Sequence, residues 1–189
     1  MITDQELARY IISTIKSHMT DISPEEFDVT PLKLQKLLYY CQGYSLALTG
    51  KTAFSEKVEA WDNGPVVESV YQEYKKYSGG IIPIGSIKPA EALNDTLKSI
   101  VDLVLADKGK YSGYTLAKAT HRETPWRKNY RGACGGVYMN AEISICDMRD
   151  YFARELSRRE EDYEGEDYAW KSIAEPVSIS ELEAAIEEL

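Results

Sequence analysis

The residues that could carry out nucleophilic chemistry are a cysteine in a glycine-rich stretch and a nearby histidine. The stretch Gly132-Ala-Cys134-Gly-Gly136 fits the GxCxG outline of a nucleophile elbow, and His121 is close enough in sequence to act as its base. An elbow needs a buried strand before the nucleophile, whereas a charged stretch, residues 127–131, precedes this one. We expect a glycine-rich surface loop and no enzyme, and keep a cysteine-dependent hydrolase using Cys134 and His121 as an alternative.

Metal and cofactor chemistry have little support in the sequence. The three cysteines show no CxxC spacing and the chain has two histidines, so neither a zinc site nor a disulfide framework is expected. His121-Arg-Glu123 resembles the HxE element of zinc deaminases, but no PCxxC follows it. Because GxGxxG and GxxxxGK[ST] are also absent, we predict no metal and no cofactor.

The charge is divided unevenly along the chain. Residues 1–154 hold 19 basic and 19 acidic side chains, whereas residues 155–189 hold 3 basic and 12 acidic ones. An acidic extension repels phosphate backbones and favours a basic protein surface, so we expect a basic protein partner and no nucleic acid. One basic cluster in the body could touch nucleic acid, but a solvated helix face or a dock for an acidic segment fits it better: Lys118, Arg122, Arg127, Lys128 and Arg131.

Composition and length place the chain among globular proteins with one domain plus an appendage. The apolar runs fall far short of the roughly 20 residues that cross a bilayer, so no membrane span is expected. The first thirty residues include acids and lack an apolar secretory region, which makes the cytoplasm the expected compartment.

Apolar spacing predicts a mainly helical domain with a few short extended or β segments. Caps and proline positions predict where helices begin, and Gly43, inside the second helix, indicates a close crossing by another element. The predicted helices cover residues 4–19, 31–49, 65–78, 89–107, 113–119, a short stretch from Thr124-Pro125, and Ile145 to about 156. The predicted extended segments are 54–61 and 81–87.

The domain boundary is placed at residue 156, giving a body of residues 1–156 and an acidic extension of residues 157–189. Residues 157–176 are polar but contain Tyr163, Tyr168 and Trp170, which a purely solvating tail does not need. Ser180 and Glu183 predict the capping box of a short terminal helix. Its apolar face needs a surface supplied by the body, a second copy of the chain or a partner.

Three stretches of the body resemble one family. They are residues 32–43 with KLQKLLYY at 33–40, residues 59–67 with AWDNGPVV at 60–67, and THRETPW at 120–126. Together they are similar to the Panacea antitoxin domain, also described as SocA-like or phage-associated, over roughly residues 5–154. This resemblance implies a mostly helical domain of bacterial and prophage toxin-antitoxin operons, which neutralises unrelated toxins by direct protein contact. The departures are Cys41, where alanine is usual, and residues 132–136.

The motif residues divide into two expected roles. A structural role is expected for Leu37, Gly43, Gly64, Pro65, Val66, Tyr71, His121, Pro125 and Trp126, with Trp61, Gly64 and Pro65 fixing the turn into the third helix. Partner binding is expected for side chains partly off the apolar stripe and for apolar residues of the extension: Tyr39, Tyr40, Gln42, Trp61, Tyr163, Tyr168, Trp170, Leu182 and Ile186.

The functional hypothesis is an antitoxin of a bacterial or prophage toxin-antitoxin system. The body would present a surface to a cognate protein toxin while the acidic extension engages a basic region of that toxin. A proteolytic adaptor that delivers its partner to a protease stays open as an alternative.

Overall fold

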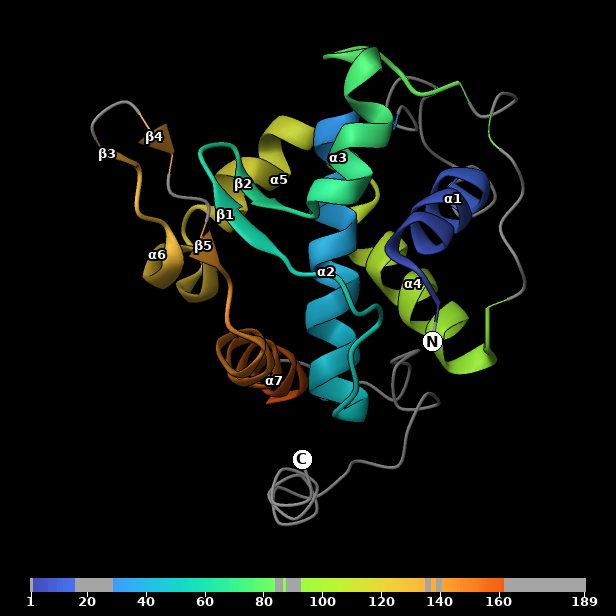
Figure 1. Cartoon of the computed structure of the whole chain (residues 1–189). Helices are drawn as coiled ribbons and strands as arrows, with labels where there is room; N and C mark the ends of the chain where they lie inside the picture. Colours follow the sequence, from blue (N-terminus) through green and yellow to red (C-terminus); the bar gives the residue numbers. More distant parts are fainter. Residues whose placement is uncertain are drawn as a thin grey trace.

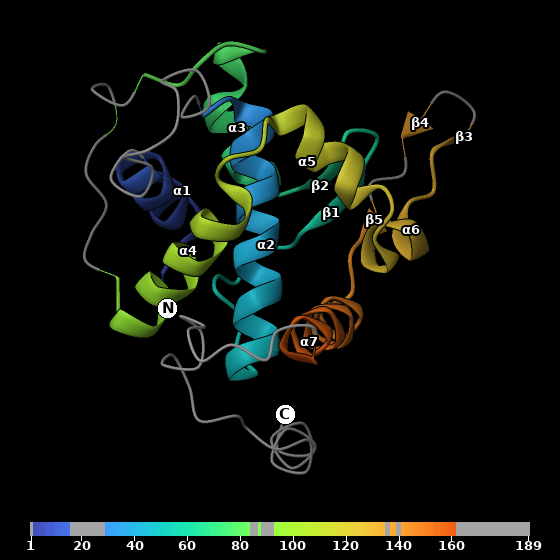
Figure 2. The ribbon, with the colours of Figure 1, turned by 180° about the vertical axis from the view of Figure 1, so that it is seen from behind.

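Helix α2 (Pro31–Thr49) is the centre of the molecule. The computed structural model describes residues 2–15, 29–83, 87, 93–134, 137–138 and 141–161. Helices α1 (Asp4–Thr14), α4 (Asp95–Lys108), α5 (Gly113–Thr120) and α7 (Ile145–Glu161) pack around α2, and Figures 1 and 2 show it enclosed from both sides. The prediction of a mainly helical domain with short β segments is confirmed.

Both ends of α2 follow the prediction. The Thr30 hydroxyl accepts from the Lys33 backbone N–H at 3.2 Å, Pro31 occupies the first turn, and Gly50 ends the helix in a left-handed conformation with φ of 67°. Fifteen of the nineteen residues of α2 are buried. The helix therefore has almost no solvent face, unlike the amphipathic helix that one apolar stripe would describe.

This enclosure corrects the expectation that Tyr39, Tyr40 and Gln42 lie partly off the buried face. Their side chains are 0%, 1% and 2% exposed, because neighbouring elements cover α2 on all sides. Gln42 also binds the main chain that follows α2, since its Oε1 accepts from the Ala53 N–H at 2.8 Å and its Nε2 donates to the Phe54 carbonyl at 3.2 Å. None of the three offers a surface to a partner in this structure.

A small antiparallel sheet covers one side of α2. Strands β1 (Glu59–Trp61) and β2 (Gly64–Val66) form a hairpin, and β5 (Ala141–Glu142) pairs with the other edge of β1, giving the order β2-β1-β5. The sequence predicted that Gly64-Pro65 would start a helix, which is wrong. They begin β2 instead, and helix α3 (Glu68–Tyr74) starts three residues after Pro65, followed by the 3-10 helix η3 (Lys75–Tyr77).

Other boundaries differ from the prediction where local signals were ambiguous. Helix α4 begins at Asp95, where the Asn94 side chain accepts from the Leu97 N–H at 2.8 Å, and not near residue 89. Helix α6 (Thr124–Asn129) has Glu123 in the N-cap position, one residue before the predicted cap. No strand forms at 81–83, and the remainder of the predicted segment, apart from residue 87, lies outside the described residues, as does Met19.

The glycine-rich segment is not simply a loop. Strands β3 (Ala133–Cys134) and β4 (Val137–Tyr138) pair antiparallel, with Cys134 opposite Val137. A nucleophile elbow requires a turn from a strand into a helix, and here Cys134 leads into a second strand. The backbone therefore contradicts the elbow geometry on which the hydrolase alternative rested.

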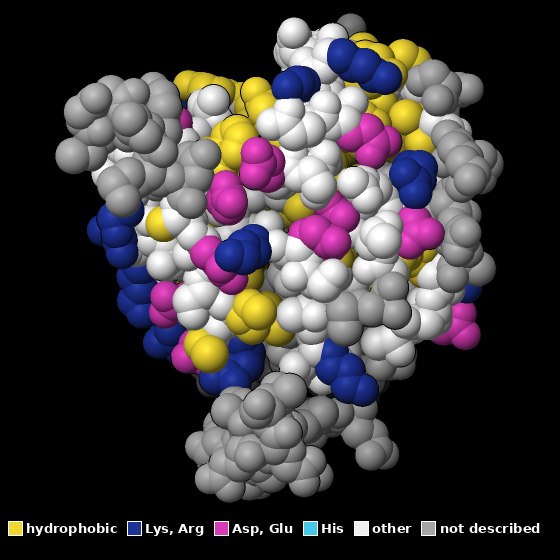
Figure 3. All heavy atoms as spheres, in the orientation of Figure 1, with side chains coloured by type: hydrophobic (Ala, Val, Ile, Leu, Met, Phe, Trp, Pro, Cys, Tyr) yellow, Lys and Arg dark blue, Asp and Glu magenta, His cyan; other side chains and the backbone are white. Residues whose placement is uncertain are grey.

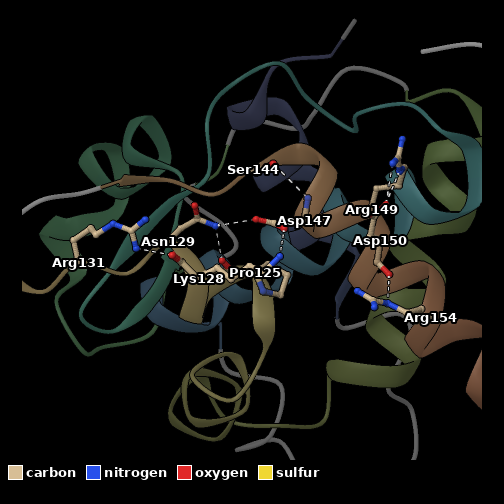
Figure 4. A network of polar contacts seen from close by, with 9 residues as sticks. All are labelled: Pro125, Lys128, Asn129, Arg131, Ser144, Asp147, Arg149, Asp150 and Arg154. Carbon is tan, nitrogen blue, oxygen red and sulfur yellow. Dashed lines mark hydrogen bonds and ion pairs between the residues drawn. The ribbon is translucent and has the colours of Figure 1, made fainter. Parts of the chain in front are cut away.

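Helix α7 closes the body against α2 and α6. The Ser144 hydroxyl accepts from the Asp147 N–H at 3.4 Å and so caps the first turn of the helix. The Asp147 carboxylate also accepts hydrogen bonds from the Lys128 ammonium at 2.7 Å and from the Asn129 amide at 3.5 Å. These bonds join the end of α6 to the first turn of α7 (Figure 4). The helix continues to Glu161, past the boundary predicted at 156.

The remaining extension lies outside the described residues. This includes Tyr163, Tyr168, Trp170, Leu182 and Ile186, together with the predicted terminal helix. In the part of the chain that the structure describes, no helix combines the length and apolar character needed to cross a bilayer.

The crossing predicted at Gly43 is confirmed by α7. A Cβ atom at Gly43 would lie 2.1 Å from two ring atoms of Phe152, so the ring occupies the space that any side chain would need. Phe152 in turn packs edge-on against the rings of Tyr39, Tyr40 and Tyr44 at centroid distances of 5.3, 5.9 and 5.6 Å. Glycine at this position sets how closely α2 and α7 approach.

Gly43→Ala should lower the free energy of unfolding. Overpacking a core typically costs about 1–3 kcal/mol, and the 2.1 Å approach to the Phe152 ring puts this site in the upper half of that range. The better helix propensity of alanine returns about 1 kcal/mol, so we expect a net loss of roughly 1–2 kcal/mol in urea denaturation. Gly79→Ala is the matched control, because a Cβ there meets nothing within 4 Å. Equal stability of the two variants would contradict the crossing, and adding Phe152→Leu should recover part of the loss.

Candidate interaction site

The KLQKLLYY and AWDNGPVV stretches are joined by two buried side chains of α2. The Lys36 ammonium donates to the Pro65 carbonyl at 2.8 Å, and Gln35 Oε1 accepts from the Val67 N–H at 2.7 Å. Strand β2 lies at an edge of the sheet, so its outer backbone groups lack a neighbouring strand. Gln35 and Lys36 supply partners at this edge that a further strand would otherwise provide.

The hairpin packs so closely on its neighbours that only glycine fits at position 64. Gly64 has φ of 95°, and a Cβ there would lie 2.6 Å from the Thr120 hydroxyl and 2.8 Å from Lys36 Nζ. Lys36 is 0% exposed, and burial lowers its pKa from 10.5 to about 7. The turn of the hairpin, the end of α5 and the Lys36 side chain therefore meet without room for another group.

The THRETPW stretch is joined to α2 by a buried carboxylate. Glu123 is 8% exposed, and its Oε1 accepts from the Tyr40 hydroxyl at 2.8 Å. Burial raises the pKa of Glu123, and the hydrogen bond from Tyr40 partly offsets this effect. Burial also raises the pKa of Tyr39 well above its ordinary value. Both tyrosines were expected at a partner surface, but Tyr40 is an internal partner of Glu123 and Tyr39 is buried against the Tyr40 ring.

The THRETPW stretch also contacts the hairpin. The Trp126 indole N–H donates to the Trp61 carbonyl at 2.9 Å. The Trp126 ring also packs against the His121 and Tyr130 rings, with centroid distances of 4.3 and 4.4 Å. Burial lowers the pKa of the half-buried His121, and the Lys36 charge lowers it further. Its Nε2 has no hydrogen-bond partner among the described residues.

These contacts frame an open cleft of about 580 Å³ between the hairpin, the first turns of α2, and α3 with η3. Its apolar walls are Pro31, Leu32, Trp61, Val66 and Tyr71, and its polar groups are Gln35, Asp62, Asn63, Lys75 and Ser78. Trp61 and Tyr71 meet edge to face at 5.0 Å. Figure 3 shows apolar side chains reaching the surface between the hairpin and α3, flanked by charged ones.

Comparison with known proteins gives one family match. The family model described as antitoxin SocA-like, Panacea domain matches residues 34–127. The chain carries a SocA-like Panacea antitoxin domain. Neither the curated proteins nor the solved structures give a match.

The Panacea match runs from α2 to α6, so it contains both partners of each contact between the three stretches. The structure places the predicted motif residues where these contacts need them. Leu37 and Val66 are buried, the Pro65 and Pro125 carbonyls accept side-chain hydrogen bonds, and Tyr71 forms a wall of the cleft. Among the predicted partner-binding residues that the structure describes, Trp61 alone borders the cleft.

Sequence reasoning missed three residues that organise the Panacea domain: Gln35, Lys36 and Glu123. A signal for them was present, because Gln35 and Lys36 are polar residues within an otherwise apolar core helix, and such residues need buried partners. Glu123 has no predicted role beyond its place in the THRETPW stretch and in the rejected zinc-deaminase outline. In the described residues, no group of three His, Cys, Asp or Glu side chains could hold a metal ion.

The predicted basic cluster of α5 and α6 is exposed. Lys128 pairs with Asp147 at 2.7 Å, and Arg131 donates to the Lys128 carbonyl. Arg122 and Arg127 form no ion pair with any described residue. The cluster lies on elements other than those that line the cleft.

Lys36 gives the Panacea domain a defined pH dependence. Between pH 7 and 10.5 the unfolded chain binds more protons at this lysine than the folded chain does. The contribution of Lys36 to the free energy of unfolding therefore increases as pH rises above 7. We expect the stability difference between wild type and Lys36→Met to shift in favour of the wild type from pH 7 to 8.5, with a slope that rises toward about 1.4 kcal/mol per pH unit.

Urea denaturation at pH 6, 7, 8 and 8.5 measures this shift. Lys51→Met, which changes an exposed lysine, is the control and should keep the wild-type slope. If Lys36→Met also keeps the wild-type slope, Lys36 does not titrate near neutral pH in the folded protein.

Proposed function

We propose that this chain is an antitoxin that neutralises a cognate protein toxin by direct binding, without catalysis. The observation that carries the proposal is the Panacea match over the residues that frame the open cleft. The polar motif residues act in internal hydrogen bonds, whereas Trp61 and Tyr71 remain half-buried at a surface where a second protein could reach them. This division suits a binding domain that operates in the cytoplasm.

The acidic extension supplies a second contact in this proposal. Residues 162–189 contain nine acidic side chains and one basic side chain, which complements a toxin with a basic site. Many toxins that act on RNA or nucleotides need such a basic site, so covering it would block their activity. The antitoxin then acts by occlusion.

The proposal predicts a stable complex with the product of the neighbouring gene. That product should arrest growth when expressed alone, and co-expression of this chain should restore growth and allow both proteins to be purified together. A harmless neighbour that does not bind would contradict the antitoxin function. Delivery to a protease would be recognised by a fall in toxin abundance on co-expression, whereas occlusion leaves the amount of toxin unchanged.

Truncation after Glu161 should weaken neutralisation while leaving the body folded, because α7 ends there and its buried residues are retained. Attraction between exposed charges is screened by salt. The full chain should therefore lose affinity between 50 and 500 mM NaCl more steeply than the truncated chain, as measured by titration calorimetry. Full neutralisation by the truncated chain would show that the extension is not required.

Cys134→Ala should retain full neutralisation. The antitoxin proposal assigns no chemistry to this thiol, whereas a cysteine hydrolase depends on it. The growth assay with the toxin measures the outcome, and Cys146→Ala, at an exposed free cysteine, is the matched control. Loss of protection by Cys134→Ala alone would favour the enzyme.

A further inference from the structure

We propose that the cleft binds one apolar side chain of the toxin between Trp61 and Tyr71, and that Gln35 Nε2 donates a hydrogen bond to a toxin backbone carbonyl beside that side chain. This inference rests on the proposed antitoxin function. It adds the binding face and the chemistry of recognition.

Gln35 is the residue that points to a ligand. It is 3% exposed and yet borders the cleft, so it lies at the inner end of the cavity. The hydrogen bond from the Val67 N–H to Oε1 fixes the orientation of the amide and leaves Nε2 as the free end. No acceptor in the described part of the chain binds Nε2. Nε2 is not among the buried side-chain atoms of the described residues that lack a hydrogen-bond partner, so it is open to the cleft, where a ligand carbonyl could accept its hydrogen bond.

The aromatic walls determine what accompanies that carbonyl. The Trp61 indole N–H already donates to the Glu59 carboxylate at 2.8 Å, so the ring offers an apolar surface with its polar tip satisfied. The edge-to-face contact with Tyr71 holds both rings in place. Tryptophan and tyrosine in such positions are enriched among the residues that dominate protein interfaces.

The dimensions of the cleft favour a short protein segment. Its volume of about 580 Å³ is within the range of ligand cavities, roughly 300–1,000 Å³. A single side chain does not fill this space, whereas a side chain with its flanking main chain does. Strand addition is not available at the adjacent β2 edge, because Gln35 and Lys36 already bind it. Recognition therefore combines one anchor with one carbonyl.

The rim of the cleft has no dominant charge. Exposed Asp62 lies on the hairpin turn, where it accepts from the Tyr130 hydroxyl at 2.8 Å, and exposed Lys75 lies on η3. An apolar contact with a balanced rim depends little on salt, whereas the contact proposed for the acidic extension depends on it strongly. Salt thus separates the two contributions.

The test measures the affinity of the full-length chain for the neighbouring gene product at 50 and 500 mM NaCl. Gln35→Glu keeps an oxygen for the Val67 N–H and removes the donor, and we expect affinity to fall about 10-fold. Trp61→Ala keeps the carbonyl that binds Trp126, and we expect affinity to fall about 30-fold or more. Both losses should be similar at the two salt concentrations.

Tyr114→Ala is the matched control, because Tyr114 is 66% exposed on α5 and does not border the cleft. It should bind as the wild type does, and thermal unfolding should show all three variants folded. If the wild type binds and both cleft variants bind equally well, the cleft inference is wrong and the antitoxin function stands. If the wild type itself does not bind, the antitoxin function fails.

Discussion

Enclosure of α2 is the constraint on which the rest of the structure depends. A helix surrounded by α1, α4, α5, α7 and the sheet cannot send its polar side chains to water, so each needs a partner inside the protein. Gln35 and Lys36 find backbone groups of the hairpin, Tyr40 finds Glu123, and Gln42 finds the main chain at 53–54. These side chains of α2 thereby set the positions of the hairpin, of the connection between α5 and α6, and of the segment that follows α2.

This constraint explains why three stretches far apart in sequence occur together. Removing one member of a buried hydrogen bond leaves the other unpaired, which costs more than the bond itself contributes. Lys36 without the Pro65 carbonyl, or Glu123 without Tyr40, would be a buried polar group without a partner. The KLQKLLYY, AWDNGPVV and THRETPW stretches therefore form one unit, and the cleft is the surface that this unit leaves open.

The parts of the fold that sequence reasoning predicted are those with local causes. The start of α2 at Thr30-Pro31, its end at Gly50 and the crossing at Gly43 follow from caps and from the absence of a side chain. Gly64-Pro65 was misread because the same dipeptide suits a helix start or an edge strand, and Lys36, which binds the Pro65 carbonyl of the edge strand, lies 29 residues away in sequence. The burial of Tyr39, Tyr40 and Gln42 was missed because periodicity assumes a solvent face that α2 lacks.

Of the residues that border the cleft, the sequence predicted partner binding for Trp61 and a structural role for Tyr71, but it assigned no role to Gln35. Its two amide ends act differently only because Val67 occupies one of them, which is a fact of tertiary structure. The proposed cleft requires two features of its partner: an apolar side chain between the two rings and a main-chain carbonyl for the Gln35 amide. Both features occur in every protein. A cleft of this kind would accept toxins of unrelated fold, and discrimination among them would then come from charges outside it. The acidic extension carries the charge excess of the chain, so it is the segment best suited to that task.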